Sequence, residues 1–594
     1  MRRFITTLTA ALLICLSANA QQPGPADLPD SVALVAEARN PAALSEQVNT
    51  LSKAVSGQEM PEKRLFRPLK RLLKLNRPVR EVVDMDHPLR LVAFNPPRHA
   101  APVLLVKVSD AQEYLDSHGE QTQVGSTAIH TLDQPMKAVG SIGNVLVLSR
   151  RKKATAQAIT SLKGTALAKA KPLYGTGSIS VEARPSAILA SLQEMPTNPL
   201  DMLKEKMKKQ LEDEQAKVAG EMSLANLKAL ESIASQVESI VDTVSVDENG
   251  VQVECLVTAA EESDLSGYFS RIGSESPRSL NYLPANAVVA FGGRVGDLSA
   301  AANWHADLMR QVLKARGADD SSIDKTVSFI NELVGTLGEE VGMACLVSAD
   351  GSLHTVETVE VKDPETYRDL YPKMATMARV MADIQPEGGK AKMNVQRDAL
   401  SYGGKSIDKW NMTFDMPVPE NIPQEQAQKM KQVQDMAMSM LMGGTESTMY
   451  ATFFDKTMVV TLGQDSLDLL KAVIDGKQKS QSESRTFTQQ ARAEKLVPNY
   501  SGAGYLSLTG LLKGALLMVH NSDINLPVPV KPGDLQFPAS PGLAMAYNCS
   551  GRTGRLKIDV PQKELKALSM GIQGAFMKVM QRAQKKQQQK MKQE

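Results

Sequence analysis

The chain has 594 residues, 42% of them apolar, which is enough for several hydrophobic cores and predicts two to four domains. Its 68 Lys and Arg residues nearly balance 66 Asp and Glu residues, giving a formal net charge of +2. Nucleic-acid-binding proteins normally carry a large basic excess, so the composition argues against that class.

The first twenty residues have the pattern of a signal peptide. The leading letters MRR are positively charged, residues 4–18 are mostly apolar, and the letters ANA at 18–20 form a small-x-small cleavage site. We therefore expect an exported protein, periplasmic or extracellular. Cleavage removes two arginines and leaves 66 basic against 66 acidic residues, a net charge of zero. No later apolar run reaches the ~18 residues that span a bilayer, so no transmembrane segment is expected after cleavage.

Two stretches with the same order of features suggest that one fold is present twice. "LPDSVALVAEARNPAALSEQ" begins at Leu28, and "LPANAVVAFGGRVGDLSAAA" begins at Leu283. Each runs from a Leu-Pro pair through an apolar strand to an arginine, and then to a Leu-Ser pair that opens a helix. Five alignments of this kind follow one another in the same order through both halves, which chance does not readily produce.

Hairpins followed by capped helices are the most detailed of these matches. "VKVSDAQEYLD" (106–116) and "VEVKDPETYRD" (359–369) each pass from a strand into a helix. Asp110 and Asp363 are placed to accept hydrogen bonds from the first free amides of that helix. In "TVSVDENGVQVECLV", Asn249-Gly250 is predicted to form the tight turn, because this pair suits positive φ at both centres.

The sequence thus predicts the α+β class, with two tandem related domains, each a mainly antiparallel sheet covered by helices. A single large α/β fold is the alternative, but it requires regular βαβ alternation with fully apolar strands. The halves differ by one or two long helices over 195–241 and by a loop and Met-rich helix over 417–444. The expected ranges are a signal peptide at 1–20, a first α+β repeat domain at 21–275, a second at 276–580, and a basic, disordered tail at 581–594.

Motifs that would indicate catalysis are weak. "YGGKS" (402–406) ends like a phosphate-binding loop, but the glycine required five residues before Gly404 is Ala399, so a turn between strands is the better interpretation. Neither a G-x-S-x-G elbow nor an H-E-x-x-H motif occurs. Three cysteines without C-x-x-C spacing remain after cleavage, and we expect single buried thiols rather than disulfides or a zinc site. They are Cys255, Cys345 and Cys549.

Two clusters invite a metal interpretation and are better explained otherwise. Asp84, Asp86 and His87 are close in sequence, but on a strand His87 would point away from the two carboxylates, and a loop explains the cluster equally well. The Met-rich stretch 430–444 offers thioethers that suit Cu(I), yet most of its methionines fall on one helical stripe, as core packing requires. An adaptable hydrophobic contact surface is a further interpretation. We predict no cofactor, no metal ligand and no catalytic residue.

The strongest charge pattern is "EKRLFRPLKRLLKLNRPVR" (62–80). On a helical wheel its leucines gather on one side and its basic residues on the other, as in a helix that lies on an anionic surface. Pro68 cannot donate to the carbonyl of Arg64, so the continuous helix should start near Arg67 and last two to three turns. A solvated helix face over the core is the alternative. The candidate residues for anionic-surface contact are Arg67, Lys70, Arg71 and Lys74.

The Leu-Pro turn, the hairpin, the V-x-V-x-D approach to a helix and the following V-L-V-L strand resemble a group of uncharacterised exported bacterial proteins with duplicated α+β domains of unknown function. The resemblance covers Leu28 to about Phe576 and implies an exported bacterial location, without carrying over any catalytic or ligand residue.

From these features we expect a non-enzymatic binding or scaffold protein of the cell envelope. Its partner would be an unknown envelope protein or an apolar ligand, with weak contact to an anionic membrane surface as an option. One alternative is a periplasmic carrier of a lipid or other apolar ligand, held between a sheet and its helices. A second alternative is a hydrolase with an unrecognised site.

Overall fold

The computed structural model shows an α+β protein with a large antiparallel sheet. Helices account for 42% and strands for 34% of the residues that it describes. The signal peptide expected at 1–20 and most of the Met-rich stretch lie outside the described residues. The structure describes residues 28–591 except 96–100, 118–119, 133–135, 170–171, 174–176, 196, 211–216, 274, 297, 299–305, 307–308, 311–312, 315–317, 349–351, 384–389, 416–422, 425, 429, 432–445, 464, 478–494 and 522–536.

The chain divides into two compact units, which are described in turn. Neither unit is continuous in sequence, in contrast to the continuous ranges 21–275 and 276–580 expected above. Unit 1 comprises Met1–Met207, Asn226–Ser270 and Tyr547–Gln562, and unit 2 comprises Lys208–Ala225, Arg271–Ala546 and Lys563–Glu594.

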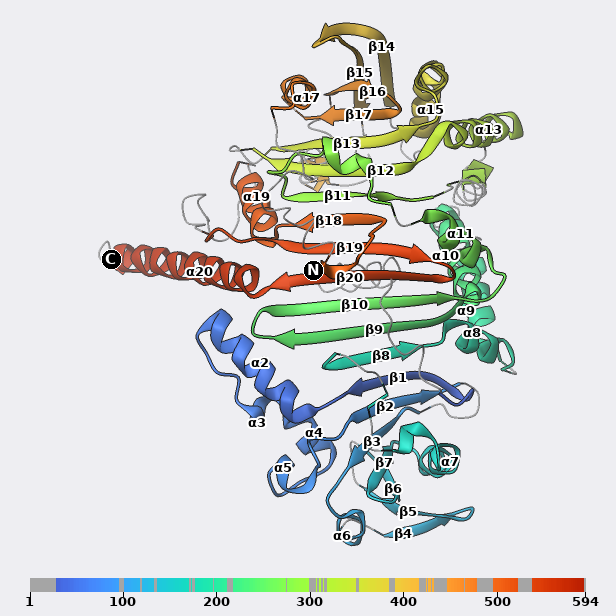
Figure 1. Ribbon diagram of the computed structural model, residues 1–594, viewed down its shortest axis with the longest axis vertical. Helices are drawn as coiled ribbons and strands as arrows, with labels where there is room; N and C mark the ends of the chain where they lie inside the picture. Colours follow the sequence, from blue (N-terminus) through green and yellow to red (C-terminus); the bar gives the residue numbers. More distant parts are fainter. Residues whose placement is uncertain are drawn as a thin grey trace. The chain divides into compact units, whose positions relative to one another are not determined.

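The strands of unit 1 pair in the order β4-β5-β6-β7-β3-β2-β1-β8-β9-β10-β20, with every neighbour antiparallel (Figure 1). β1 illustrates the cause, because its side chains alternate between buried and half-buried over most of its length, as a pleated strand requires. The strands are β1 (Val32–Ala38), β2 (Leu89–Phe94), β3 (Val103–Lys107), β4 (Gln121–Val124), β5 (Thr127–Thr131), β6 (Ala138–Ile142), β7 (Val145–Ser149), β8 (Ile179–Ala183), β9 (Val237–Asp247), β10 (Gly250–Ala259) and β20 (Thr553–Pro561).

Helices connect the strands of unit 1. The long helices expected over 195–241 are present as α9 (Pro199–Gln210) and α10 (Lys217–Gln236), whose residues are divided between the two units. The others are α2 (Pro41–Ser56), α3 (Glu62–Leu65), α4 (Arg67–Leu72), α5 (Val79–Val82), α6 (Ala111–Asp116), α7 (Lys152–Leu162), α8 (Pro185–Gln193) and α11 (Asp264–Ile272), whose last two residues belong to unit 2, with a 3-10 turn η1 (Ala166–Ala168).

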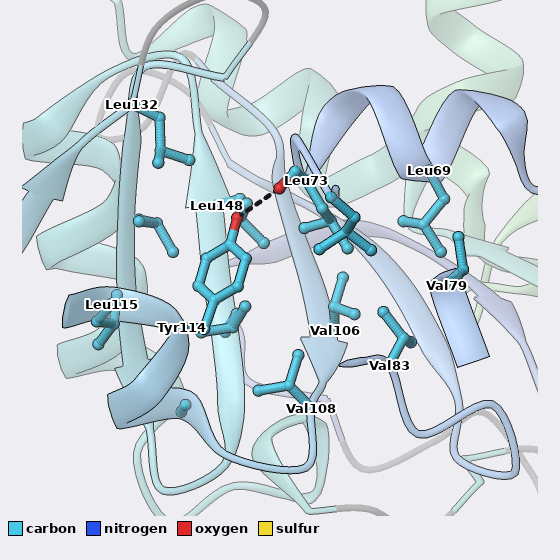
Figure 2. Packing of buried hydrophobic residues seen from close by; sticks show 14 of the residues in the cluster. Leu69, Leu73, Val79, Val83, Val106, Val108, Tyr114, Leu115, Leu132 and Leu148 are labelled. Carbon is cyan, nitrogen blue, oxygen red and sulfur yellow. Dashed lines mark hydrogen bonds between the residues drawn. The ribbon is translucent and has the colours of Figure 1, made fainter. Parts of the chain in front are cut away.

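A buried cluster in unit 1 joins the short helices α4, α5 and α6 to strands β3, β6 and β7 (Figure 2). Leu73, Val106, Leu146 and Leu148 have no exposed surface. Burying aliphatic side chains of this size stabilises the fold by roughly 1.5–3 kcal/mol each. The cluster therefore fixes the helices that carry the basic residues 62–80.

The strands of unit 2 pair in the order β18-β11-β12-β13-β17-β16-β15-β14, again all antiparallel. The strands are β11 (Val289–Arg294), β12 (Leu337–Val347), β13 (Leu353–Val361), β14 (Lys390–Tyr402), β15 (Lys405–Asp415), β16 (Glu446–Phe454), β17 (Thr457–Leu462), β18 (Gly502–Leu506) and β19 (Leu543–Ser550), the last divided between the units at 546/547. The helices are α13 (Asp320–Thr336), α14 (Pro364–Arg368), α15 (Tyr371–Asp383), α17 (Ser466–Ile474), α19 (Leu508–Asn521) and α20 (Gln562–Met591), with a 3-10 turn η2 (Arg278–Tyr282).

Eight consecutive strands in the pairing order of unit 1 correspond to the eight paired strands described in unit 2. Raising each number in β8-β1-β2-β3-β7-β6-β5-β4 by ten gives the order in unit 2. Helix α7 packs on β6 and β7, and α17 packs on β16 and β17. The predicted helix caps are confirmed, because Asp110 accepts from the amides of Gln112 and Glu113 in α6, and Asp363 accepts from the amide of Thr366 in α14.

Two of the turns predicted from glycine-containing pairs can be compared with the structure. The "YGGKS" stretch is a turn between β14 and β15, as predicted, with φ of 55° at Gly403 and 75° at Gly404. The β9–β10 turn differs from the prediction, because Asp247 pairs with Gly250 and the turn residues are therefore Glu248 and Asn249. Gly250 already belongs to β10.

The C-terminal segment also differs from the sequence prediction. Residues 581–594 were expected to form a disordered basic tail, whereas α20 continues as a helix through Met591. Lys, Arg, Gln, Ala and Met, which make up 581–591, are good helix formers, and no glycine or proline interrupts them. The missing apolar face was therefore not sufficient to end the helix.

Candidate anion-binding surface

Three short helices, α3, α4 and α5, carry most of the basic residues of 62–80, and Lys74 and Arg77 lie between α4 and α5. Pro68 occupies one of the first two positions of α4, where its missing N–H would have had no helical partner. Proline is therefore tolerated there, and α4 starts at Arg67 as predicted. The helix ends at Leu72 and is shorter than the predicted two to three turns.

The apolar side of α4 is fixed to the core of unit 1. Leu69 and Leu73 are buried, and the hydroxyl of Tyr114 in α6 donates to the carbonyl oxygen of Leu73 at 3.0 Å (Figure 2). Burial raises the pKa of Tyr114 to about 12, so this hydroxyl remains a donor at neutral pH. The chain turns immediately afterwards at Lys74, which has a φ of 49°. The backbone that carries the basic side chains is thus fixed by contacts on the buried side of α4.

The opposite side of these helices carries three arginines around one shallow depression. Arg64, Arg67 and Arg71 line it together with Pro68 and Leu72, and its volume is about 400 Å³. Arg67 and Arg71 are four residues apart on α4 and therefore share one side of it, and Arg64 reaches the same depression from α3. Each side chain is exposed. A guanidinium presents several donors in a fixed plane and matches the oxygens of phosphate, sulfate and carboxylate groups.

Nearby carboxylates pair with arginines outside the depression. Glu62 contacts Arg80 at 2.7 Å, and Glu113 lies 4.0 Å from Arg77. These exposed pairs contribute little stability, but they neutralise the flanks of the basic helices. The described ion pairs of this segment therefore involve Arg80 and Arg77, and not the arginines that line the depression.

The four predicted contact residues do not all lie at the same place. Arg67 and Arg71 line the depression, whereas Lys70 and Lys74 are exposed on the same segment but are not among its lining residues. Arg64 was not among the four, although it lines the depression. The signal that would have found it is the i, i+3, i+7 spacing continuing backwards across Pro68.

The Asp84 cluster is occupied by a lysine. The ammonium of Lys107 lies 3.1 Å from Asp84 Oδ2 and 3.0 Å from His87 Nε2, while His87 Nδ1 lies 2.6 Å from Asp84 Oδ2. Burial would raise the pKa of Asp84, but hydrogen bonds from His87 and Lys107 lower it below its usual range. A lysine cation here disfavours a second cation. Within the described residues, no group of three or more His, Cys, Asp and Glu side chains is placed to hold a metal ion.

A serine–histidine contact occurs at the β12–β13 hairpin in unit 2. Ser348 Oγ lies 2.5 Å and Ser352 Oγ 3.2 Å from Nε2 of His354, which is buried. A catalytic serine normally relies on a histidine oriented by a carboxylate at the other ring nitrogen. The residues that the structure describes include no carboxylate paired with His354, so this contact accounts for the buried imidazole without implying catalysis.

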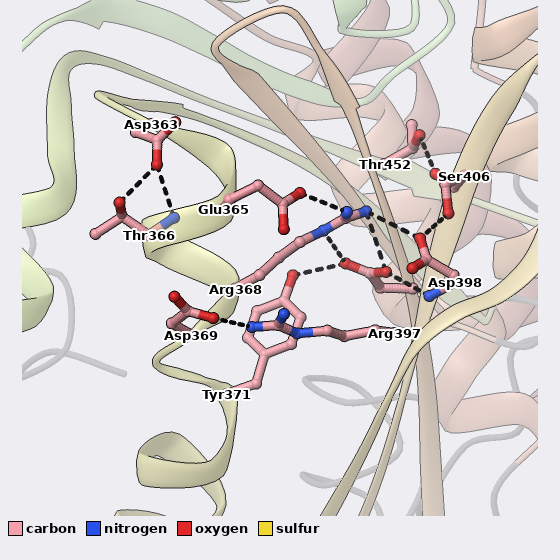
Figure 3. A network of polar contacts seen from close by, with 11 residues as sticks. Asp363, Glu365, Thr366, Arg368, Asp369, Tyr371, Arg397, Asp398, Ser406 and Thr452 are labelled. Carbon is pink, nitrogen blue, oxygen red and sulfur yellow. Dashed lines mark hydrogen bonds and ion pairs between the residues drawn. The ribbon is translucent and has the colours of Figure 1, made fainter.

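A polar network in unit 2 joins α14 and α15 to the β14–β15 hairpin (Figure 3). Its centre is the fully buried carboxylate of Asp408, which accepts from Arg368 Nε at 3.0 Å and from the Tyr371 hydroxyl at 2.8 Å. The amide of Asp398 donates to the same carboxylate at 2.9 Å. Burial, followed by the nearby Asp408 charge, raises the pKa of Tyr371. All of these partners belong to unit 2, and the network positions two helices on a hairpin.

The three cysteines are free thiols. Cys255 and Cys549 are buried, as predicted, and Cys345 is half-buried. Burial raises the pKa of Cys549 to about 12 and also raises the pKa values of Cys255 and Cys345. Because the thiolate is the reactive form, these cysteines are poorly suited to nucleophilic or metal-binding roles.

A groove between α13 and α15 in unit 2 has a volume of about 620 Å³. Phe329 and Met377 contribute apolar surface to it, and a 2.6 Å ion pair between Lys373 and Glu332 stands at its wall. Its size falls in the range of small-molecule sites.

Comparison with known proteins does not add a family to this geometry. No protein-family model matches the chain, and neither a curated protein nor a solved structure gives a match. Among the helices that the structure describes, none combines the length and apolar character needed to cross a bilayer.

Proposed function

We propose that the protein is a non-enzymatic binding or scaffold protein, exported to the cell envelope, that contacts an anionic group through α3 and α4. The observation that carries this proposal is the convergence of Arg64, Arg67 and Arg71 on one depression, above a helix face that is buried in the core. The signal-peptide pattern of residues 1–20 supports export.

Binding would rest on the three guanidinium groups that line the depression. Three guanidinium groups can donate several charge-assisted hydrogen bonds to one oxyanion, and bonds to charged groups contribute roughly 1.5–3 kcal/mol each when water is partly excluded. The arginines are exposed, so their attraction is screened by salt. We therefore expect weak, salt-sensitive binding to an acidic protein, glycan or lipid headgroup.

We also propose that the two units are copies of one ancestral unit. The matching strand order from β1 to β8 and from β11 to β18 supports this, together with the equivalent caps at Asp110 and Asp363. The basic run 62–80 belongs to the first copy, whereas α13, in the corresponding segment between β11 and β12, has three acidic residues and one lysine. Duplication followed by specialisation would explain why one unit carries the anionic contact.

The binding proposal is tested with a triple charge reversal in the full chain, Arg64→Glu, Arg67→Glu and Arg71→Glu. We expect retention on a heparin column and binding to phosphatidylglycerol vesicles to fall at least tenfold. The matched control reverses Lys206, Lys209 and Lys228, which are exposed on α9 and α10 and change the net charge by the same amount. Equal losses in both variants would show that only total charge matters and would overturn the proposal.

A carrier of an apolar ligand is the second candidate, and the groove between α13 and α15 favours it. Organic extraction of the purified protein followed by mass spectrometry would reveal a stoichiometric lipid if the groove holds one. Substituting Phe329→Glu should then release that lipid without changing heparin retention. An extract that contains no stoichiometric apolar molecule would count against the carrier.

A further inference from the structure

The helix α20 is anchored at its start and exposed beyond it. The carboxylate of Glu564 is fully buried and accepts from the amides of Thr509 and Gly542, each at 3.1 Å. Ala567 is buried, and the ring of Phe537 lies against Gly571. These contacts hold the first turns of α20 against unit 2.

From Met570 onwards the same helix exposes large apolar side chains. Phe576 is 61% exposed, Met577 is 58% exposed and Ile572 is 52% exposed, and Met570 and Met580 are also exposed. At about 100° per residue, these five side chains fall within one stripe about 160° wide and about 15 Å long. A contiguous apolar stripe of this kind on a soluble protein indicates a contact surface.

The charges on this part of α20 all have one sign. No Asp or Glu occurs from residue 565 to 591, whereas six Lys and Arg residues do. Lys578, Arg582 and Lys585 follow an i, i+4, i+7 spacing, which places them on the side of the helix opposite the apolar stripe. An apolar face with a basic opposite face is the pattern of a helix that lies in a membrane interface.

We infer that the second half of α20 lies on the surface of an anionic lipid bilayer, with Ile572, Phe576 and Met577 inserted at the headgroup boundary. Lysine and arginine stems are long enough to bring their charges to the headgroup phosphates from the polar side of the helix. A second copy of the chain is a poorer occupant, because α20 has no Asp or Glu from residue 565 to 591 and two such helices would offer no acidic side chains to each other's basic residues there. The helix lies on the bilayer rather than crossing it, since the apolar stripe covers only part of its circumference and about half the bilayer core thickness.

The inference does not depend on the anionic contact proposed for α4, and a separate variant tests it. The full chain is mixed with vesicles of phosphatidylcholine containing phosphatidylglycerol, and with vesicles of phosphatidylcholine alone, and the bound fraction is measured by flotation. We expect binding to the anionic vesicles. The triple substitution Ile572→Gln, Phe576→Gln and Met577→Gln should lower the partition coefficient at least tenfold.

The matched control replaces three comparably exposed apolar residues on α9 and α10, Met202→Gln, Leu230→Gln and Ile233→Gln, and should bind like the wild type. Circular dichroism and thermal melting verify that both variants fold. Undiminished binding by the α20 variant would overturn the inference, and so would equal binding to neutral vesicles. A dimer that dissociates only in the α20 variant, measured by light scattering without lipid, would assign the stripe to a second copy instead.

If the α20 variant alone loses vesicle binding and still retains heparin binding, the membrane contact belongs to α20 and not to α4. Loss in the Arg64, Arg67 and Arg71 variant alone would support the α4 contact and contradict the α20 surface. The two proposals can therefore fail independently.

Discussion

Only glycine fits at position 250, at the start of β10, because the backbone of β20 lies too close for a β-carbon. Its φ is 148°, and a β-carbon built on it would lie 2.1 Å from the carbonyl oxygen of Val560. We predict that Gly250→Ala lowers the free energy of unfolding by roughly 2 kcal/mol or more, because the clash involves backbone and cannot be relieved by a rotamer change. Chemical denaturation of the full chain measures this.

A glycine with open surroundings provides the control. Gly267 lies within α11, and a β-carbon there would meet nothing within 4 Å. Gly267→Ala should leave stability unchanged or raise it by about 0.5–1 kcal/mol, since alanine is the better helix former. Similar losses in the two variants would contradict the role given to the Val560 carbonyl.

The same residue shows what sequence reasoning missed at this scale. The pair Asn249-Gly250 suits a tight turn, and this local preference predicted the turn one residue too late in the chain. The turn residues are Glu248 and Asn249. The decisive constraint is the neighbouring strand β20, about 300 positions away, which no local pattern reveals. The buried Asp408 network was missed for the same reason, because Arg368 and Asp408 are distant in sequence and adjacent only in the fold.

At the scale of single elements, the helix caps of the two units should be energetically equivalent. We predict that Asp110→Ala and Asp363→Ala each cost about 1 kcal/mol of stability, because each removes the acceptor for the first free amides of its helix. Thermal unfolding by calorimetry would show both effects. Hydrogen bonds from the side chain and the amide of Thr366 lower the pKa of Asp363.

Asp465 supplies the matched control for the caps. It occupies the N-cap position of α17, but its side chain makes no capping hydrogen bond. Asp465→Ala should therefore change stability by less than about 0.5 kcal/mol. A loss as large as that of the other two substitutions would mean that helix-dipole effects, not the capping bonds, account for the cost.

Most elements were predictable because their signals are local. Alternating apolar residues marked the hairpins β2–β3 and β12–β13, and aspartates marked the starts of α6 and α14. The extent of α20 was not predictable from amphipathicity, because helix propensity alone carries residues 581–591. The depression lined by Arg64 also escaped prediction, because the helix expected from the sequence starts near Arg67 and leaves Arg64 outside it.

At the scale of the whole molecule, strand β20 is attached to β10 by a buried ion pair. Arg555 is 1% exposed and donates from Nε to Glu254 Oε1 at 2.8 Å, and Lys557 lies 3.4 Å from the same carboxylate. We predict that Glu254→Gln costs about 2 kcal/mol, because it leaves the buried guanidinium without a counter-charge. Hydrogen exchange should accelerate across Thr553–Pro561 more than elsewhere in unit 1.

Glu248→Gln is the control, because Glu248 is exposed in the β9–β10 turn. This substitution removes one negative charge from the same hairpin and should leave exchange in β20 unchanged. If both variants loosen β20 equally, net charge rather than the ion pair with Arg555 governs its attachment.

The pairing of β10 with β20 also means that the sheet of unit 1 can be completed only late in translation. Glu254 and Arg555 are 301 positions apart, so at about 5–20 residues per second the ribosome needs about 15–60 s to deliver the partner strand. During that interval β10 presents a bare row of amides and carbonyls, the kind of edge that recruits strands from other chains. The nascent chain is thus most prone to aggregation in the interval before β20 is synthesised, when the edge of β10 is unpaired. Faster completion of translation shortens this interval.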